Sequence, residues 1–200
     1  MINLRKDNIS SYSQRNNEIT PLEACPVTAM CQALAILGYT FPEGPYKQEE
    51  DNLAEFITKD KDCKVLYKNL DPNHEHKPYG IHRILCYGTD KWLNKHICRD
   101  KEVVSVTQII ENITKGNCVL LSGRFPTYRG TPINHIICCH GFNDDGLIIS
   151  DSYGNYRNLY ADKICGKNIV MPWKDVTEYI KPCNSPFKRC IVVEGKKWGN

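Results

Sequence analysis

The spacing of apolar residues changes at Gly116, and this change limits the possible folds more than any other feature of the sequence. Before Gly116, apolar residues recur at the three- and four-residue spacing that places them on one face of a helix. After Gly116, they form short continuous runs typical of strands. A helical part followed by a stranded part indicates an α+β fold rather than alternating strands and helices.

The clearest helical pattern predicts a helix from Cys25 to Leu37, with Pro26 in its first turn and Gly38 after its end. Its apolar face consists of Val27, Met30, Cys31, Leu34 and Leu37. Weaker patterns predict helices over residues 47–58, 81–87, 90–96 and 106–115. The polar, proline-containing stretch 69–80 is predicted to be a loop.

Apolar runs predict strands over residues 118–121, 133–139, 146–150, 169–171 and 190–193. The segment Asn143–Gly146 reads Asn-Asp-Asp-Gly, a turn signal that predicts a hairpin between the second and third of these strands. The expected architecture is therefore a layer of N-terminal helices packed on a C-terminal antiparallel sheet.

Length and composition indicate one folded domain over residues 1–200, with a polar N-terminal segment over residues 1–24. The chain has 200 residues, of which 41% are hydrophobic and 24% charged, and these values exclude intrinsic disorder. Its net charge of +3 is too small to indicate nucleic-acid binding. No apolar run approaches the ~18 residues of a membrane span, and the N-terminus resembles no signal peptide, so we expect cytoplasmic synthesis.

The 11 cysteines are an odd number at irregular spacings, and without an export signal they are expected to be free thiols. His74-Glu75-His76, with His82 and Cys86 nearby, is the strongest candidate for a metal site. It lacks the ligand spacing of a zinc site, so a solvated loop is the better interpretation. The sequence therefore predicts no metal and no cofactor.

Cys25 is the cysteine with an argument for reactivity, because it stands at the predicted start of a helix. Unpaired backbone N–H groups and the helix dipole stabilise an anion there, and the thiolate is the nucleophilic form of cysteine. The alternative interpretation, a small buried hydrophobic residue, is favoured for other cysteines that lie within apolar patterns. These are Cys31, Cys118, Cys138 and Cys139.

A thiolate nucleophile requires a histidine base and a group that orients it. His135 begins a predicted strand, and Asp151 ends the next strand, so the hairpin should bring the two side chains together. His140 lies five positions after His135 and should face the other side of the sheet, because strand side chains alternate. The sequence thus predicts a triad of Cys25, His135 and Asp151, although a lone strand histidine is often a hydrogen-bonded core residue.

Four segments resemble the papain-like cysteine peptidases, and more closely the branch of double-glycine (bacteriocin-leader) peptidases with its stand-alone bacterial and phage relatives. Cys25–Met30 is similar to the nucleophile helix of that branch. Asn134–Phe142 and Asp151–Asn155 are similar to its histidine strand and to its Asp-Pro-Tyr-Gly-Asn segment. Ser13–Asn17 resembles a segment that precedes the nucleophile in phage-type and cell-wall-lytic members.

The resemblance implies a papain-like fold in which Cys25 is the nucleophile, His135 the general base and Asp151 the residue that orients the imidazole. It also implies an oxyanion hole formed by the Cys25 backbone N–H and an upstream amide side chain. Two tyrosines flank the predicted site and are candidates for substrate binding, namely Tyr128 and Tyr153.

The amide of the oxyanion hole is left open between several residues. At the usual spacing before the nucleophile the chain has Ile19 and Thr20, neither of which carries a side-chain amide. Asn17 is the nearest amide and the first candidate, and Gln14 and Asn16 are the alternatives.

Together these features predict a cysteine hydrolase that cleaves peptide or amide bonds through a thioester. The resemblance favours a peptidoglycan-degrading endolysin, an endopeptidase or amidase of phage or prophage origin that reaches the cell wall at lysis. One alternative is an intracellular cysteine peptidase or effector that acts on proteins. The other is a catalytically inactive papain-like binding module. The sequence predicts no nucleic-acid partner and leaves the oligomeric state open.

Overall fold

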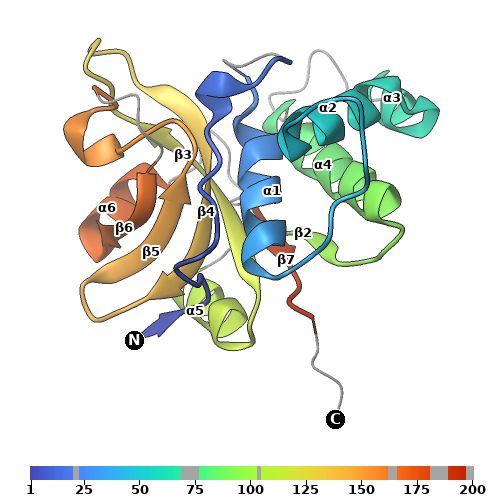
Figure 1. Cartoon of the computed structure of the whole chain (residues 1–200). Helices are drawn as coiled ribbons and strands as arrows, with labels where there is room; N and C mark the ends of the chain where they lie inside the picture. The colour runs from blue at the N-terminus through green and yellow to red at the C-terminus, as the bar shows by residue number, and fades with distance from the viewer. Residues whose placement is uncertain (20–22, 69–76, 103–104, 162–165, 181–188, 197–200) are drawn as a thin grey trace.

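The computed structural model describes residues 1–19, 23–68, 77–102, 105–161, 166–180 and 189–196, and its helices and strands form two adjoining parts (Figure 1). Most helices lie to one side of a curved sheet. The α-helices are α1 (Cys25–Ile36), α2 (Glu49–Lys59), α3 (Lys61–Lys68), α4 (Lys77–Leu93), α5 (Val106–Thr114) and α6 (Trp173–Tyr179). Two short 3-10 helices are η1 (Gln14–Asn16) and η2 (Tyr156–Asn158).

The strands form an antiparallel sheet in the order β2-β7-β3-β4-β5-β6, and β1 pairs with β4 outside this path. Their bounds are β1 (Ile2–Asn3), β2 (Cys98–Glu102), β3 (Cys118–Phe125), β4 (Ile133–Phe142), β5 (Gly146–Asp151), β6 (Gly166–Pro172) and β7 (Arg189–Val193). Helices and an antiparallel sheet confirm the predicted α+β class, although β1 and β2 precede the other strands in the chain and were not expected.

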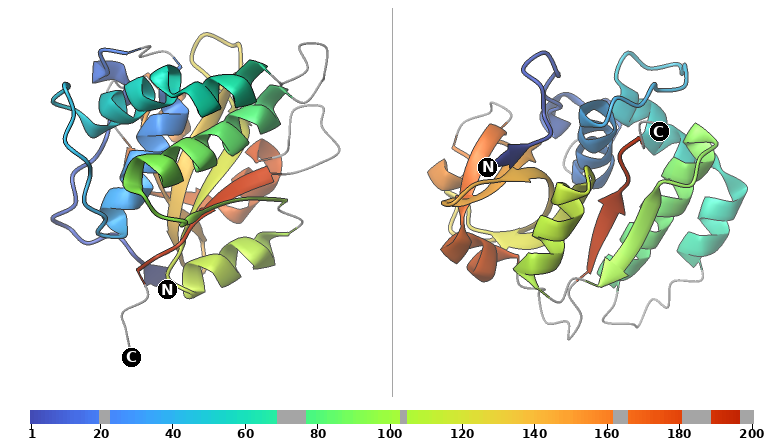
Figure 2. Two further views of the ribbon diagram at one scale, coloured as in Figure 1. Left: turned by 90° about the vertical axis from the view of Figure 1, so that its right-hand side faces the viewer. Right: turned by 90° about the horizontal axis from the view of Figure 1, so that it is seen from below.

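Helix α1 packs against β3 and β4, and the alternation of side chains along β4 explains how it does so. Ile136 and Cys138 lie in the apolar cluster that contains Met30 and Leu34 of α1. Ile137 lies in a second cluster, on the other face, with residues of α5 and α6. The sheet is therefore buried on both faces, and the views in Figure 2 show helices on each side of it.

The largest difference from the sequence-based prediction is helix α4. The predicted loop 69–80 and the predicted helices 81–87 and 90–96 give way, from Lys77 onward, to one continuous helix that ends at Leu93. Pro78 falls in the first turn, where proline is tolerated. At Gly88 the helix lies close to α2, because a Cβ on Gly88 would lie 2.5 Å from Ile57 Cγ1. Residues 69–76, which include His74 and His76, lie outside the described residues.

The polar N-terminal segment runs between the sheet and α1 (the blue trace in Figure 1). Leu4 donates its backbone N–H to His140 of β4, and Tyr12 donates its own to the side chain of Gln32 on α1. Gln14 then donates its N–H to the carbonyl of Ser152, just after β5. The segment thus joins the two parts of the molecule and brings residues 13–19 to the end of β5.

The described part of the chain bears on two predictions, those of free thiols and of no membrane span. There, all nine cysteines are free thiols, as expected. No helix within the described ranges is both long and apolar enough to cross a membrane.

Candidate active site

His135 and Asp151 lie together at the start of β4 and the end of β5, as the hairpin predicted. His135 Nε2 is 2.7 Å from Asp151 Oδ1. Both residues are buried: the exposed fraction is 3% for His135 and 0% for Asp151. A buried ion pair costs desolvation free energy, which is offset when further donors satisfy the carboxylate.

Asp151 has such donors. Its Oδ1 also accepts the backbone N–H of Tyr153 at 3.0 Å, and its Oδ2 accepts the hydroxyl of Tyr160 at 3.1 Å. Burial and the neighbouring Asp151 charge raise the pKa of Tyr160, which keeps its hydroxyl protonated as a donor. The carboxylate is therefore held in one orientation, with one oxygen turned to the imidazole.

Aromatic rings surround the imidazole. The ring centroids of Phe125, Tyr160 and Tyr153 lie 5.8, 5.9 and 6.0 Å from that of His135. Burial alone lowers the pKa of His135, but the charge of Asp151, its hydrogen bond and the Cys25 side chain outweigh this effect and raise it to about 10. In this environment the imidazole is positively charged at neutral pH.

Cys25 is the first residue of α1 and is half-buried. Its side chain lies close enough to His135 to raise the pKa of the imidazole. Because Asp151 binds Nε2, the ring nitrogen left for the sulfur is Nδ1. No side chain caps the N-terminus of α1 at Ala24, so the first N–H groups of the helix lack a side-chain acceptor there. The structure thus brings the three predicted residues together.

The two leading amide candidates contact different elements next to this arrangement, α1 in one case and the residue after β5 in the other. Asn17 is buried, its Nδ2 is 3.5 Å from Thr28 Oγ1 on α1, and its Oδ1 has no hydrogen-bond partner. Gln14 is also buried, and its Oε1 accepts the hydroxyl of Ser152 at 2.9 Å. Asn16, the remaining alternative, is exposed.

Sequence reasoning did not find the residues of α2 that hold this N-terminal segment. The buried carboxylate of Asp51 accepts the backbone N–H groups of Glu18 and Ile19, each at 3.0 Å. Gln48 donates its side-chain amide to the carbonyl of Asn16 at 2.6 Å. The segment that carries both amide candidates is therefore fixed by polar side chains from the region 47–58, for which the sequence predicted a helix but no such role.

His140 takes no part in this site. Its Nδ1 is 3.0 Å from Asn3 Oδ1, and its Nε2 is 3.0 Å from Ser150 Oγ. Burial and the nearby charge of Arg5 lower the pKa of His140 to about 3, so this ring is neutral. The choice of His135 over His140 agrees with these contacts.

The two tyrosines predicted for substrate binding have different environments. Tyr153 is half-buried beside the His135 ring, and the guanidinium carbon of Arg15 lies 3.9 Å from the Tyr153 ring centroid. Tyr128 is 58% exposed, and its backbone N–H donates to the carbonyl of Leu159 at 2.9 Å. Both lie near the turn that follows β5.

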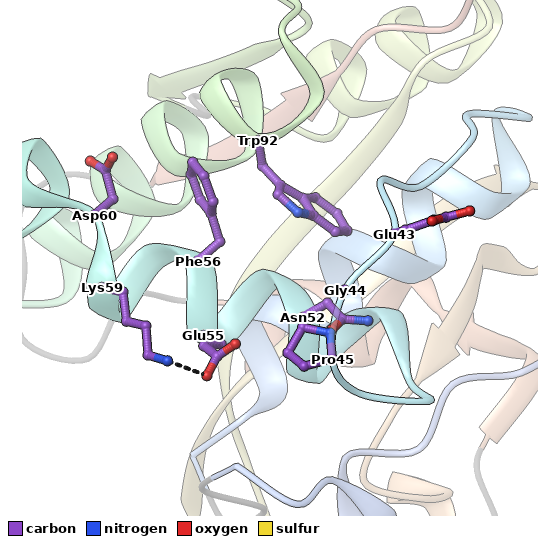
Figure 3. Close-up of a pocket in the computed structure, with 9 residues that line it drawn as sticks. All are labelled: Glu43, Gly44, Pro45, Asn52, Glu55, Phe56, Lys59, Asp60 and Trp92. Carbon is purple, nitrogen blue, oxygen red and sulfur yellow. Dashed lines mark ion pairs between the residues drawn. The ribbon is translucent and has the colours of Figure 1, made fainter.

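A pocket of about 390 Å³ lies elsewhere, on the helical part of the molecule (Figure 3). It is lined by Phe56 and Trp92 together with charged residues such as Glu55 and Lys59, which form an ion pair. None of the predicted catalytic or substrate-binding residues lines it. The pocket is therefore separate from the candidate active site.

A helix that begins with a cysteine and packs on an antiparallel sheet that supplies a histidine and an aspartate is the arrangement of the papain-like cysteine peptidases. The sequence model of the Peptidase C39-like family matches residues 6–178, and the chain belongs to this family. The matched range includes all the candidate site residues.

One solved structure similar to this chain is a protein from Bacillus anthracis described as a C39-like peptidase. The two chains are 13% identical, with a TM-score of 0.46, and the alignment covers 97% of this chain and 98% of the other. A comparison with curated proteins gives no significant match.

Proposed function

We propose that this protein is a cysteine peptidase in which Cys25, His135 and Asp151 act as a catalytic triad. The observation that carries the proposal is the buried, hydrogen-bonded pair of His135 and Asp151, with the Cys25 side chain close enough to the same imidazole to raise its pKa. A positively charged imidazole beside a sulfur at a helix N-terminus favours the thiolate, which is the attacking species.

The reaction follows from these positions. The Cys25 sulfur attacks the carbonyl carbon of a peptide or amide bond, and a tetrahedral oxyanion forms. Collapse of this intermediate breaks the C–N bond, His135 gives its proton to the leaving amine, and a thioester remains. Water, deprotonated by His135, then attacks the thioester, and the carboxylic acid and the Cys25 thiol are released. Asp151 keeps the ring oriented and stabilises its charged form.

The oxyanion would be bound by the Cys25 backbone N–H and one amide side chain. Asn17 is the first candidate because its Nδ2 has only a long contact of 3.5 Å, so it can turn to a new acceptor at little cost. Gln14 is the alternative because Ser152 holds its Oε1, which fixes the orientation of the amide. Alanine at the true donor should lower kcat on the order of 10²-fold or more. Alanine at the other position should leave kcat nearly unchanged.

The substrate we propose is the peptide part of peptidoglycan, with the protein acting as a phage or bacterial endolysin after release at lysis. The support is the resemblance of Ser13–Asn17 to a segment of cell-wall-lytic enzymes. A peptidase that acts on proteins inside the cell remains the second candidate. The inactive binding module is the least supported hypothesis, because the buried ion pair of His135 and Asp151 would then have no catalytic role.

Two measurements test this function. Iodoacetamide at neutral pH should alkylate Cys25 faster than any other cysteine, including Cys98, the other half-buried thiol in the described part. Purified protein should release fragments from cell-wall preparations, as read by mass spectrometry. The Cys25→Ala variant should release none, while the matched Cys98→Ala variant should behave as the parent. Equal activity of the parent and the Cys25→Ala variant would overturn the proposed mechanism.

If cell walls stay intact while protein substrates are cut in a Cys25-dependent way, the intracellular peptidase is the correct reading and the endolysin is wrong. If Cys25 shows no preferential alkylation and no substrate is cleaved, the binding module is correct.

A further inference from the structure

Two arginines contact the tyrosines that are predicted to bind substrate. Among the described residues, no carboxylate forms an ion pair with Arg15 or Arg129. Both guanidinium groups instead contact the tyrosines at the end of β5 and in the loop between β3 and β4. Positive charge without a protein counterion beside an active site indicates where an anionic group of a ligand can bind.

Arg15 lies one aromatic ring away from the imidazole. Its guanidinium carbon is 3.9 Å from the centroid of the Tyr153 ring, and that centroid is 6.0 Å from the His135 ring. Its Nε donates to the Tyr153 carbonyl at 2.8 Å, and one terminal nitrogen approaches the Tyr160 carbonyl at 3.5 Å. These contacts fix the plane of the guanidinium and leave its other terminal nitrogen, Nη1, without a hydrogen bond in the described structure.

Arg129 is exposed and lies in the loop between β3 and β4. Its Nε donates to the Tyr128 hydroxyl at 3.0 Å, and its guanidinium carbon lies 5.4 Å from the centroid of the Tyr128 ring. The backbone of Tyr128 is bound to Leu159, next to Tyr160, which anchors this loop to the turn after β5. The Tyr128 hydroxyl that Arg129 binds raises the pKa of the Arg129 guanidinium, and Tyr153 adds a smaller effect in the same direction.

The chemistry of these groups selects a carboxylate. Arginine binds a carboxylate through parallel N–H groups, and an aromatic ring beside it supplies an apolar surface for the rest of the ligand. The Asp151 carboxylate cannot neutralise this region, because it is buried and bound to His135. A cationic substrate side chain would be repelled by both arginines.

We propose that Arg15 and Arg129 form a carboxylate-binding subsite beside Tyr153, and that the substrate carries an acidic residue next to the bond cleaved. The inference rests on the proposed peptidase function, and it adds a substrate class to it. Arg129, which is exposed and does not support the fold, supplies the adjustable part of the subsite. Arg15 also fixes the turn after β5.

The experiment compares matched peptides that contain Glu or Gln at each position flanking the scissile bond. For the parent protein, kcat/KM should be about tenfold or more higher for Glu than for Gln at one of these positions, as expected for a hydrogen bond between charged groups. Arg129→Ala should reduce this ratio several-fold, mainly through a higher KM for the Glu peptide. Arg83→Ala, an exposed arginine of α4, is the control and should keep the ratio.

Arg15→Lys retains the charge but not the planar fork, and it should also lower the Glu preference. An equal kcat/KM for Glu and Gln peptides, or a preference that Arg129→Ala does not change, would overturn the subsite while Cys25-dependent cleavage still stood. If no peptide is cleaved in a Cys25-dependent way, the peptidase function fails, and the subsite that rests on it fails as well.

Discussion

Two histidines of β4, His135 and His140, are both buried, and yet His135 is positively charged while His140 is neutral. His135 has a pKa raised to about 10, while that of His140 is lowered to about 3. Burial lowers the pKa in both cases, because it disfavours the charged ring. The difference comes from the partner on β5: His135 binds the carboxylate of Asp151, whereas His140 binds the hydroxyl of Ser150.

The charged groups near each ring add to the difference between the two pKa values. Ser150 accepts a hydrogen bond from the Arg5 guanidinium at 2.8 Å, so His140 has a positive charge nearby instead of a negative one. Ser150 and Asp151 are neighbours in sequence, and strand alternation directs them to opposite faces. Adjacent residues on one strand thus produce a charged histidine at the candidate site and a neutral histidine in the structural core.

The change expected to have the largest effect is Asp151→Asn, which removes the charge that distinguishes the two histidines. The amide can no longer stabilise the imidazolium or its tautomer, and kcat should fall on the order of 10²- to 10⁴-fold. Ser150→Ala is the matched control one residue away, and it should alter kcat less than about twofold. Steady-state kinetics with the folded state checked by circular dichroism measures both. A comparable loss of kcat in the two variants would contradict the assignment.

The second-largest expected effect is on the pH dependence of the free energy of unfolding, to which His135 and His140 should contribute in opposite directions. The folded pKa of His135 lies above the ordinary value of 6.5, so its stabilising contribution is complete below pH 6.5 and is lost as the pH rises toward 10. The folded pKa of His140 lies below 6.5, so its contribution is complete above pH 6.5 and is lost as the pH falls toward 3. Each ring changes the free energy of unfolding by up to ~1.4 kcal/mol per pH unit within its window.

Urea unfolding of the parent, His135→Gln and His140→Gln across pH 4 to 10 tests this expectation. The His135→Gln variant should lose the decline in stability on the alkaline side, and His140→Gln should lose part of the decline on the acid side. If both variants remove the decline on the same side of the pH profile, the pKa values of the two histidines are not shifted in opposite directions.

The sequence predicts the pairing of His135 with Asp151, and the opposite facing of His140, because both depend on local geometry. A hairpin with a turn at Asn143–Gly146 brings the start of one strand beside the end of the next, so Asp151 reaches His135 without any knowledge of the remaining fold. The apolar period of α1 likewise predicts its position and places Cys25 at its N-terminus. Neither inference requires a contact with a distant part of the chain.

Contacts between distant segments could not be predicted in the same way. The pattern alone does not show that β7, near the C-terminus, pairs between β2 and β3. Asp51 appeared to be one charge among several on α2, and its role in holding Glu18 and Ile19 depends on tertiary structure. Helix α4 was divided in the prediction because proline and glycine weaken a helix locally, whereas its close approach to Ile57 of α2 at Gly88 is a tertiary contact.

The smallest expected effect concerns Tyr160, which donates its hydroxyl to the Asp151 oxygen that does not face His135. Tyr160→Phe keeps the ring that packs on the imidazole and removes only this donor, so the carboxylate retains its charge and its bonds to His135 and Tyr153. We expect kcat to fall a few-fold, the size of one hydrogen bond of about 1 kcal/mol. Tyr156→Phe is the matched control, because the Tyr156 hydroxyl also donates to a carboxylate, that of Asp175, at 3.0 Å.

Both tyrosine variants lose one hydrogen bond to an aspartate, which is buried for Tyr160 and partly buried for Tyr156, so both unfolding free energies should fall. If kcat falls in Tyr160→Phe and not in Tyr156→Phe, the hydroxyl acts through the orientation of Asp151. If the two variants differ only in stability, the carboxylate is held firmly enough by His135 and the Tyr153 N–H, and the charge of Asp151 alone would then account for the contrast between the two histidines of β4.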